Sequence, residues 1–173
     1  MSQAVLVKTL VSWLNDKLGL RPGQCGVELP PGIPPPSAPH TVLTLVIGST
    51  TEDSAGNSDF INEIYYVDVN VNRKTGLLPG DRGHIHYLEH IIGLEAKARQ
   101  VIRALHGSEE FRIEASGLLP SGVEFSTPLM YQGMPPVRAF ADAGSYANPD
   151  PDTWVVQTVP FRGMRRTQRV EVL

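Results

Sequence analysis

One alternating segment followed by one long periodic segment constrains this chain more than any other feature of its sequence. From position 65 to position 72, apolar side chains occupy the odd positions, among them Val67, Val69 and Val71. A period of two is typical of a β-strand with one covered face and one wet face. We therefore predict a strand over Phe60–Lys74. The side chains on its wet face are Asp68, Asn70 and Asn72.

A long helix is predicted to cover that strand. Pro79 and Gly80 break the chain, and Asp81 stands where a helix N-cap is favoured. From about Gly83 to Leu105, apolar residues then recur at roughly helical spacing. At ~1.5 Å per residue, such a helix is long enough to cross a whole sheet.

The remaining elements predict an α+β fold, with a mainly antiparallel sheet. Leucines at every fourth position indicate an N-terminal helix, packed with the long helix on one face of the sheet. The segment Val42–Ile47 is apolar on both faces, which favours a central strand. Long Pro- and Gly-rich loops join the elements. The other predicted elements are a helix at Gln3–Leu18 and strands at Glu109–Ala115, Val123–Ser126 and Trp154–Phe161, with a further strand optional at Arg165–Val172.

Composition sets the broad class. The 173 residues fit a single domain, 1–173, and 41% apolar with 19% charged residues is globular. Prolines and glycines cluster in two extended arms, at 19–41 and 116–152. A net charge of −3 gives no indication of a protein that binds nucleic acid mainly by neutralising phosphates. No apolar run reaches the ~18 residues of a membrane span. The lone Cys25 cannot form an internal disulfide and favours a reducing compartment.

Three histidines are the best candidates for metal chemistry. His84 and His86 differ by ~200° around a helix, so their side chains diverge. His86 and His90 share a helix face, but a good third ligand is missing from the pattern. A metal-dependent hydrolase using His86 and His90 is therefore the least favoured alternative. We predict no enzymatic activity, no cofactor and no metal, and assign no role to these histidines.

The densest positive run lies near the C-terminus and supplies candidate interface residues. It could contact an acidic partner or DNA phosphates, or it could protect an edge strand from aggregation. Trp154 and Trp13 suit either a core or a subunit interface. The candidate interface residues are Trp154, Arg162, Arg165, Arg166 and Arg169.

The order of elements resembles the tail terminator (tail completion) proteins of tailed bacteriophages. The N-terminal helix Val5–Leu18 is followed by a Pro-containing stretch and a strand that ends in Val-Ile-Gly. The alternating strand Ile64–Val71 and the helix that ends at Gly107 follow, and a last strand begins at Trp154. The resemblance covers most of residues 1–115. The arm at 22–39 and the loop at 116–152 are larger than a compact terminator requires.

The resemblance implies a structural virion protein, assembled in the host cytoplasm and located in the tail or neck, away from membranes. Such proteins form a homo-oligomeric ring, usually a hexamer, at the head-proximal end of the tail tube. The ring stops tube growth, contacts the tail tube protein and the head–tail connector protein, and lets DNA pass through its lumen. Asp68, Asn70 and Asn72 would face that lumen, and the two arms would reach neighbouring subunits. The alternatives are another head–tail connector or neck subunit, or a small binding module with a Pro-rich docking arm.

Overall fold

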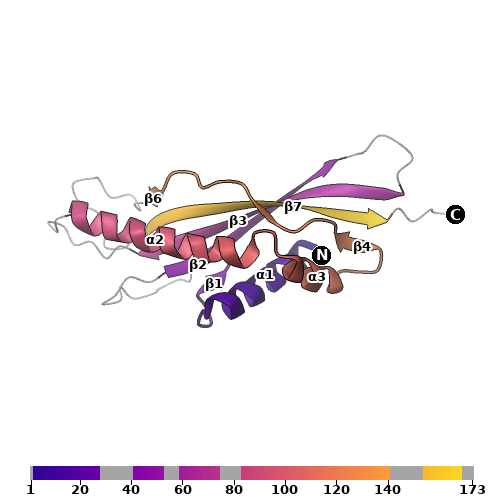
Figure 1. Ribbon diagram of the computed structural model, residues 1–173, viewed down its shortest axis with the longest axis horizontal. Helices are drawn as coiled ribbons and strands as arrows, with labels where there is room; N and C mark the ends of the chain where they lie inside the picture. The colour runs from indigo at the N-terminus through magenta and orange to yellow at the C-terminus, as the bar shows by residue number, and fades with distance from the viewer. Residues whose placement is uncertain (1, 28–40, 53–58, 75–82, 141–153, 169–173) are drawn as a thin grey trace.

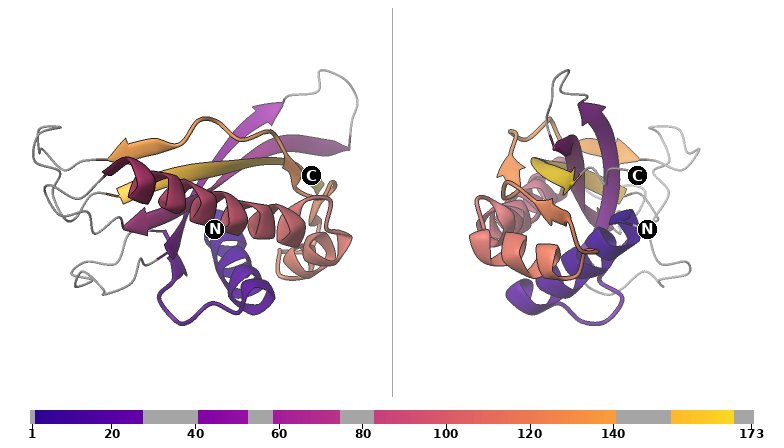
Figure 2. Two further views of the ribbon diagram at one scale, coloured as in Figure 1. Left: turned by 60° about the vertical axis from the view of Figure 1, so that its left-hand side comes forward. Right: turned by 90° about the vertical axis from the view of Figure 1, so that its right-hand side faces the viewer.

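In the part of the chain that the structure describes, three helices lie over one face of a curled sheet (Figure 1; Figure 2), so the α+β prediction is confirmed. The structure is a computed structural model, and it describes residues 2–27, 41–52, 59–74, 83–140 and 154–168. Its elements are α1 Ser2–Leu18, β1 Cys25–Gly26, β2 Thr41–Glu52, β3 Phe60–Lys74, α2 Gly83–Leu105, α3 Glu109–Gly117, β4 Val123–Phe125, β5 Met130–Tyr131, β6 Arg138–Phe140 and β7 Trp154–Gln168.

Two long strands form the centre of the sheet. The strand order is β1-β2-β3-β7-β4, and β5 and β6 also pair with β7. Strands β3 and β7 are antiparallel along their whole lengths, from Phe60 opposite Gln168 to Lys74 opposite Trp154. Strand β2 is antiparallel to β3, whereas β1 is parallel to β2. The sheet is therefore mainly antiparallel, as predicted.

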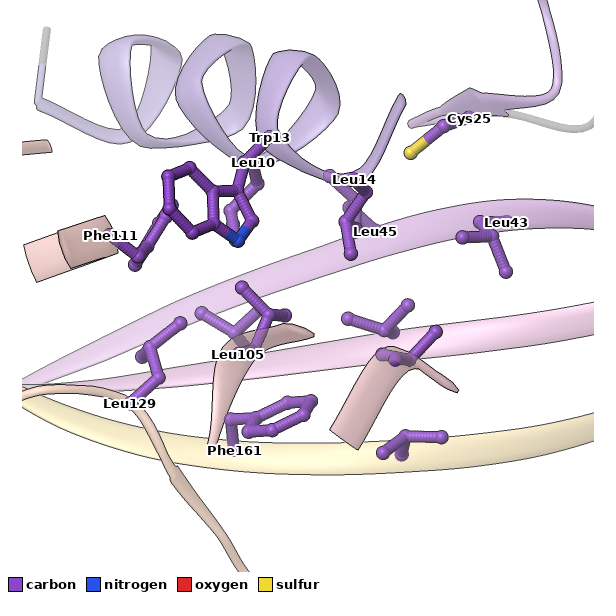
Figure 3. Close-up of a cluster of buried hydrophobic side chains, with 14 of the residues drawn as sticks. Leu10, Trp13, Leu14, Cys25, Leu43, Leu45, Leu105, Phe111, Leu129 and Phe161 are labelled. Carbon is purple, nitrogen blue, oxygen red and sulfur yellow. The ribbon is translucent and has the colours of Figure 1, made fainter. Parts of the chain in front are cut away.

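The core fills the space between the helices and the face of β3 that carries Val67, Val69 and Val71. Figure 3 shows α1 lying over the strands with Leu10, Trp13 and Leu14 directed into this layer. The indole Nε1 of Trp13 donates to the carbonyl oxygen of Ala104 at 2.9 Å, and the ring meets Phe111 edge-on with centroids 5.5 Å apart. Trp13 is thus a core residue that ties α1 to both other helices. We call the helix-covered side of the sheet the inner face and the opposite side the outer face.

Local periodicity located the two dominant elements correctly. The strand Phe60–Lys74 and the helix Gly83–Leu105 begin and end where the sequence predicted. The segment Glu109–Ala115, predicted as a strand, is instead the helix α3. Ser108 begins it, since its side-chain oxygen accepts from the backbone N–H of Phe111 at 3.1 Å. Glu109 and Glu110 in the first turn favour the same helix electrostatically.

Strand β2 does not occupy the central position predicted for Val42–Ile47. Beyond it lies only the two-residue β1 among the described strands, so most of β2 runs along the edge of the sheet. Its apolar residues do lie on both faces, but Val46 on the outer face is 56% exposed. Apolar character on both faces was therefore a poor guide to a central position here.

The two strands predicted near the C-terminus, from Trp154 and from Arg165, belong to a single strand, β7. Strand β7 continues from Trp154 through Gly163 to Gln168 without a break in its pairing with β3. Gly163 reads as an interruption in the sequence, but a Cβ there would lie 3.0 Å from Leu129 Cδ2. The glycine therefore permits close packing against the chain that crosses β7, rather than ending the strand.

Much of the segment after α3 runs alongside β7 (Figure 1). Strands β4, β5 and β6 pair in turn with its C-terminal, middle and N-terminal parts. Only the first of the three was predicted, as Val123–Ser126. The described part of the 116–152 arm thus contacts its own subunit through β7.

Candidate functional site

The outer face of the sheet carries the residues predicted to face a lumen, and it divides into two halves. Around Asn72 the face is buried, with only 4% of that residue exposed, and Val42, Thr44 and Thr158 beside it are also buried. At Tyr66 it is open, since Tyr66 is 42% exposed, whereas Ile64, the next residue of β3 on this face, is buried. Asp68 and Asn70 lie between the two halves and are half-buried. The uniformly wet face that the alternation predicted is therefore not what the structure shows at Asn72.

A polar network explains why the buried half is polar. The amide nitrogen of Asn72 lies 2.9 Å from Thr44 Oγ1 and 3.1 Å from both the Val42 and Asn70 carbonyl oxygens. The Thr158 hydroxyl donates to Asn70 Oδ1 at 2.7 Å. These bonds join β2, β3 and β7. Asn72 is thus occupied in holding the sheet together, and a lumen-facing role stays a prediction for Asp68 and Asn70.

The open half of the outer face carries a mixed apolar and cationic patch, which we call the Tyr66 patch. In the antiparallel register Tyr66 lies opposite Arg162, and Arg162 lies opposite Met130. Residues opposite one another share a face, about 5 Å apart. Val46 stands one row away, opposite Asp68. Val46, Tyr66 and Met130 are 42 to 56% exposed, and Arg162 is exposed.

The predicted interface arginines do not form one surface. Only Arg162 stands in the Tyr66 patch. Arg165 points to the inner face, where it pairs with Glu63 and lies 4.9 Å from the centroid of the Tyr65 ring.

Arg166 returns to the outer face. There it pairs with Glu124 of β4 and lies 4.8 Å from the centroid of the Phe60 ring. Arg169 and the Trp154 side chain lie outside the described residues. The alternation of a strand thus separates charges that looked like one cluster in the sequence.

A hollow of about 510 Å³ lies on the inner side, between the start of α1, the α3–β4 connection and β7. Its lining is mostly apolar, with Arg165 as its charged group. Because Glu63 already pairs with this guanidinium, the hollow offers little free charge to a ligand. The lining residues are Val5, Leu118, Leu119, Pro120, Val123, Arg165 and Thr167.

The candidate groups for chemistry are dispersed. Within the described part of the chain, no three His, Cys, Asp or Glu side chains gather closely enough to hold a metal. The side chains of His84, His86 and His90 lie outside that part, although their backbone belongs to α2. The metal-hydrolase alternative is therefore untested. No described helix is both long and apolar enough to cross a bilayer.

Cys25 lies in β1 rather than in an open loop, and its side chain is buried beside β2. Burial raises the pKa of the Cys25 thiol to about 11. The thiolate, which is the nucleophilic form, is therefore scarce at neutral pH. This environment suits a structural thiol.

Comparisons with known proteins leave the family of the chain open. No protein-family model and no curated protein matches it. Among solved structures, a chain from "Virion of native gene transfer agent (GTA) particle" is similar, with 17% identity and a TM-score of 0.44, over 90% of this chain and 84% of that chain. A likeness at that level assigns neither a family nor a role.

Sequence reasoning missed the Tyr66 patch because its members come from four separate segments. Val46, Tyr66, Met130 and Arg162 meet only through the register of β2, β3, β5 and β7. A usable signal was present at Tyr66, since it is a large aromatic residue at an even, otherwise polar position of the alternating strand.

Proposed function

We propose that this chain is a structural protein of a phage-type virion that works by assembling with copies of itself and with other virion proteins. More specifically, we propose that the chain is a tail terminator. A closed ring, with six subunits as the expected number, sits at the head-proximal end of the tail tube, stops tube growth and joins the tube to the head connector. DNA passes through the ring, and the subunit performs no catalysis.

The observation that carries this proposal is the Tyr66 patch on a sheet of long, continuously paired strands. An exposed group of Val46, Tyr66 and Met130 around Arg162 has the composition of a protein contact surface, where aromatic residues, methionine and arginine are enriched. The long strands β3 and β7 hold this patch in fixed geometry. The resemblance of the order of elements to that of tail terminators supports a place in the tail.

In such a ring, part of the outer face would border the central channel. Asp68 and Asn70 are half-buried at the border of the Tyr66 patch, so they would line the channel beside the subunit contact that the patch makes. The channel surface would then carry acidic and amide groups. A surface of this kind lets DNA pass without the strong salt-dependent binding of a continuous positive patch.

Electron microscopy of the purified chain, alone and with its tail tube protein, tests the proposal. We expect closed rings with a central channel on tube ends and shorter tubes when the chain is added during polymerisation. Tyr66→Ser with Arg162→Ser should weaken ring formation or capping. Ile113→Ser, at an exposed position on α3 away from the patch, is the matched control. Unchanged tube lengths with the wild-type chain would contradict the proposal.

A further inference from the structure

The two long edges of the sheet differ in whether their outward-directed backbone groups have hydrogen-bond partners. On the edge beyond β7, side chains occupy outward backbone groups of the short strands β4 and β5. Phe125 N–H donates to Ser116 Oγ at 3.0 Å, and Arg112 Nη1 donates to the Phe125 carbonyl oxygen at 3.0 Å. Tyr131 N–H donates to His106 Nδ1 at 3.0 Å. Since an added strand needs these same groups, this edge is sealed at β4 and β5.

The edge formed by β2 lacks such seals in the described structure. Strand β1 covers only Leu43 and Thr44, and Leu43 N–H donates to the Gln24 carbonyl oxygen at 2.7 Å. Leu43 therefore directs its backbone groups away from β3. Because this direction alternates along an antiparallel strand, Leu45, Ile47, Ser49 and Thr51 do the same. No described strand pairs with β2 on this side beyond Thr44.

The composition of the open edge favours pairing rather than solvation. From Thr41 to Thr51 the sequence contains no charged residue and no proline. Soluble proteins usually protect an exposed edge strand with lysines, prolines, bulges or a covering segment. Val46 is more than half exposed at the same place. From Thr41 to Thr51, β2 thus lacks the charged residues and prolines that would discourage an incoming strand.

We propose that the β2 edge of one copy pairs antiparallel with the β2 edge of a second copy, across a two-fold axis at Gly48. The sealed β4–β5 edge cannot serve as the partner edge, whereas an uncharged strand meets its own antiparallel copy without like-charge repulsion. Gly48 is the midpoint of the open stretch from Leu45 to Thr51. The pairing uses the open edge of both copies and therefore stops at two, instead of growing into a ribbon.

This contact goes beyond the proposed function, because it concerns the free subunit and does not depend on a ring. About eight inter-strand hydrogen bonds would form between the odd-numbered residues of the two β2 strands. Gly48 would then face the partner's Gly48 in a narrow, non-hydrogen-bonded pair with Cα atoms about 4.5 Å apart. That separation falls within the range of about 4.4–6.8 Å that a disulfide spans. A Cβ added at Gly48 meets nothing within 4 Å.

Site-directed cross-linking tests the position of the axis. Gly48→Cys should form a disulfide-linked dimer under mild oxidation. Val46→Cys, which is on the same face and exposed, is the matched control, because its two copies would lie about 13 Å apart along the strands. We expect Gly48→Cys to cross-link at least about tenfold faster. Equal rates for the two variants would overturn the proposed register, and the buried Cys25 of the wild-type chain should give no cross-link.

Light scattering and sedimentation test the pairing itself. The wild-type chain should be a dimer at micromolar concentration, and Ser49→Pro should be a monomer. This proline removes an outward N–H and leaves the β2–β3 ladder intact. Ser49→Ala should remain a dimer. A monomeric wild-type chain, or a Ser49→Pro dimer with unchanged affinity, would refute the proposal. If circular dichroism shows that Ser49→Pro does not fold, the cross-linking rates of the two cysteine variants decide whether the dimer forms. Ring formation on tube ends tests the proposed function and is measured in a separate experiment.

Discussion

Replacement of Glu63 by glutamine tests whether Arg165 stabilises the subunit or serves an interface. Glu63 and Arg165 stand opposite one another on the inner face of β3 and β7, with side chains 21% and 11% exposed. Arg165 Nε is buried and has no hydrogen-bond partner. Burial also lowers the pKa of Arg165 from its ordinary value. The guanidinium therefore depends on Glu63 as its counter-charge.

The expected cost of Glu63→Gln is about 3 kcal/mol in the free energy of unfolding. Removing one partner of a buried ion pair typically costs about 3–5 kcal/mol, because the remaining charge is buried without compensation. The low end applies here, since both side chains retain some exposure. For a domain of this size, 3 kcal/mol corresponds to a fall in Tm of roughly 6–12 °C. Replacing both residues, as Glu63→Gln with Arg165→Met, should restore most of the lost stability.

Urea and thermal unfolding followed by circular dichroism measure this effect. The matched control is Glu124→Gln, which removes the partner of Arg166 from a pair whose side chains are 42% and 45% exposed. Such an exposed pair contributes at most about 1 kcal/mol. Similar losses at Glu63 and Glu124 would refute the burial argument. A stable Glu63→Gln variant that fails to assemble would instead favour the interface role that the sequence indicated for Arg165.

Three further changes probe the thiol, the outer face and the core. The Cys25 thiol, with its pKa raised from 9.0 to about 11, should react with iodoacetamide at pH 8 about 100-fold more slowly than the unfolded chain. The unfolded thiol loses its proton at a lower pH than the folded one, so the stability contributed by Cys25 should be full below pH 9. It should fall by roughly 3 kcal/mol between pH 9 and pH 11. Urea unfolding over a series of pH values measures this fall, and the Cys25→Ala variant should not show it. Asn72→Ala removes the three hydrogen bonds of a buried side-chain amide and should cost about 2 kcal/mol in urea unfolding, whereas Asp68→Ala should change stability little. Trp13→Phe loses the bond to Ala104 and should cost about 1–2 kcal/mol by thermal unfolding, and an unchanged Tm would contradict that bond's role.

The parts of the fold that the sequence predicted are those set by local periodicity. The apolar stripe of α2 and the alternation of β3 are each long enough to exclude the other type of element. The helix α3 was mistaken for a strand because Phe111, Ile113 and Ala115 alternate over so short a segment. Its true signal was Ser108, a good N-cap followed by two acidic residues. In the structure Ile113 is exposed and not part of any covered face.

The errors in β2 and β7 arose from contacts between distant segments. In the sequence Gly163 suggests the end of a strand, whereas in the structure Leu129 packs against it. The seals on β4 and β5 depend on side chains from α3 and from the end of α2, so they cannot be read from the strands themselves. Periodicity gives the face on which a side chain lies, but not what covers that face. For this reason Asn72 looked wet in the sequence and is buried in the structure.

The polar side of β3 therefore serves two purposes along its length. Around Asn70 and Asn72, hydrogen bonds to β2 and β7 fix the register of three strands. A slip of one residue would turn every side chain of β3 to the opposite face, so a polar lock in this position protects the core as well as the sheet. Around Tyr66 and Arg162 the same face is open and available to a partner. A subunit that must present one patch in a fixed orientation needs both halves, because the patch is assembled from strands whose register the buried half secures.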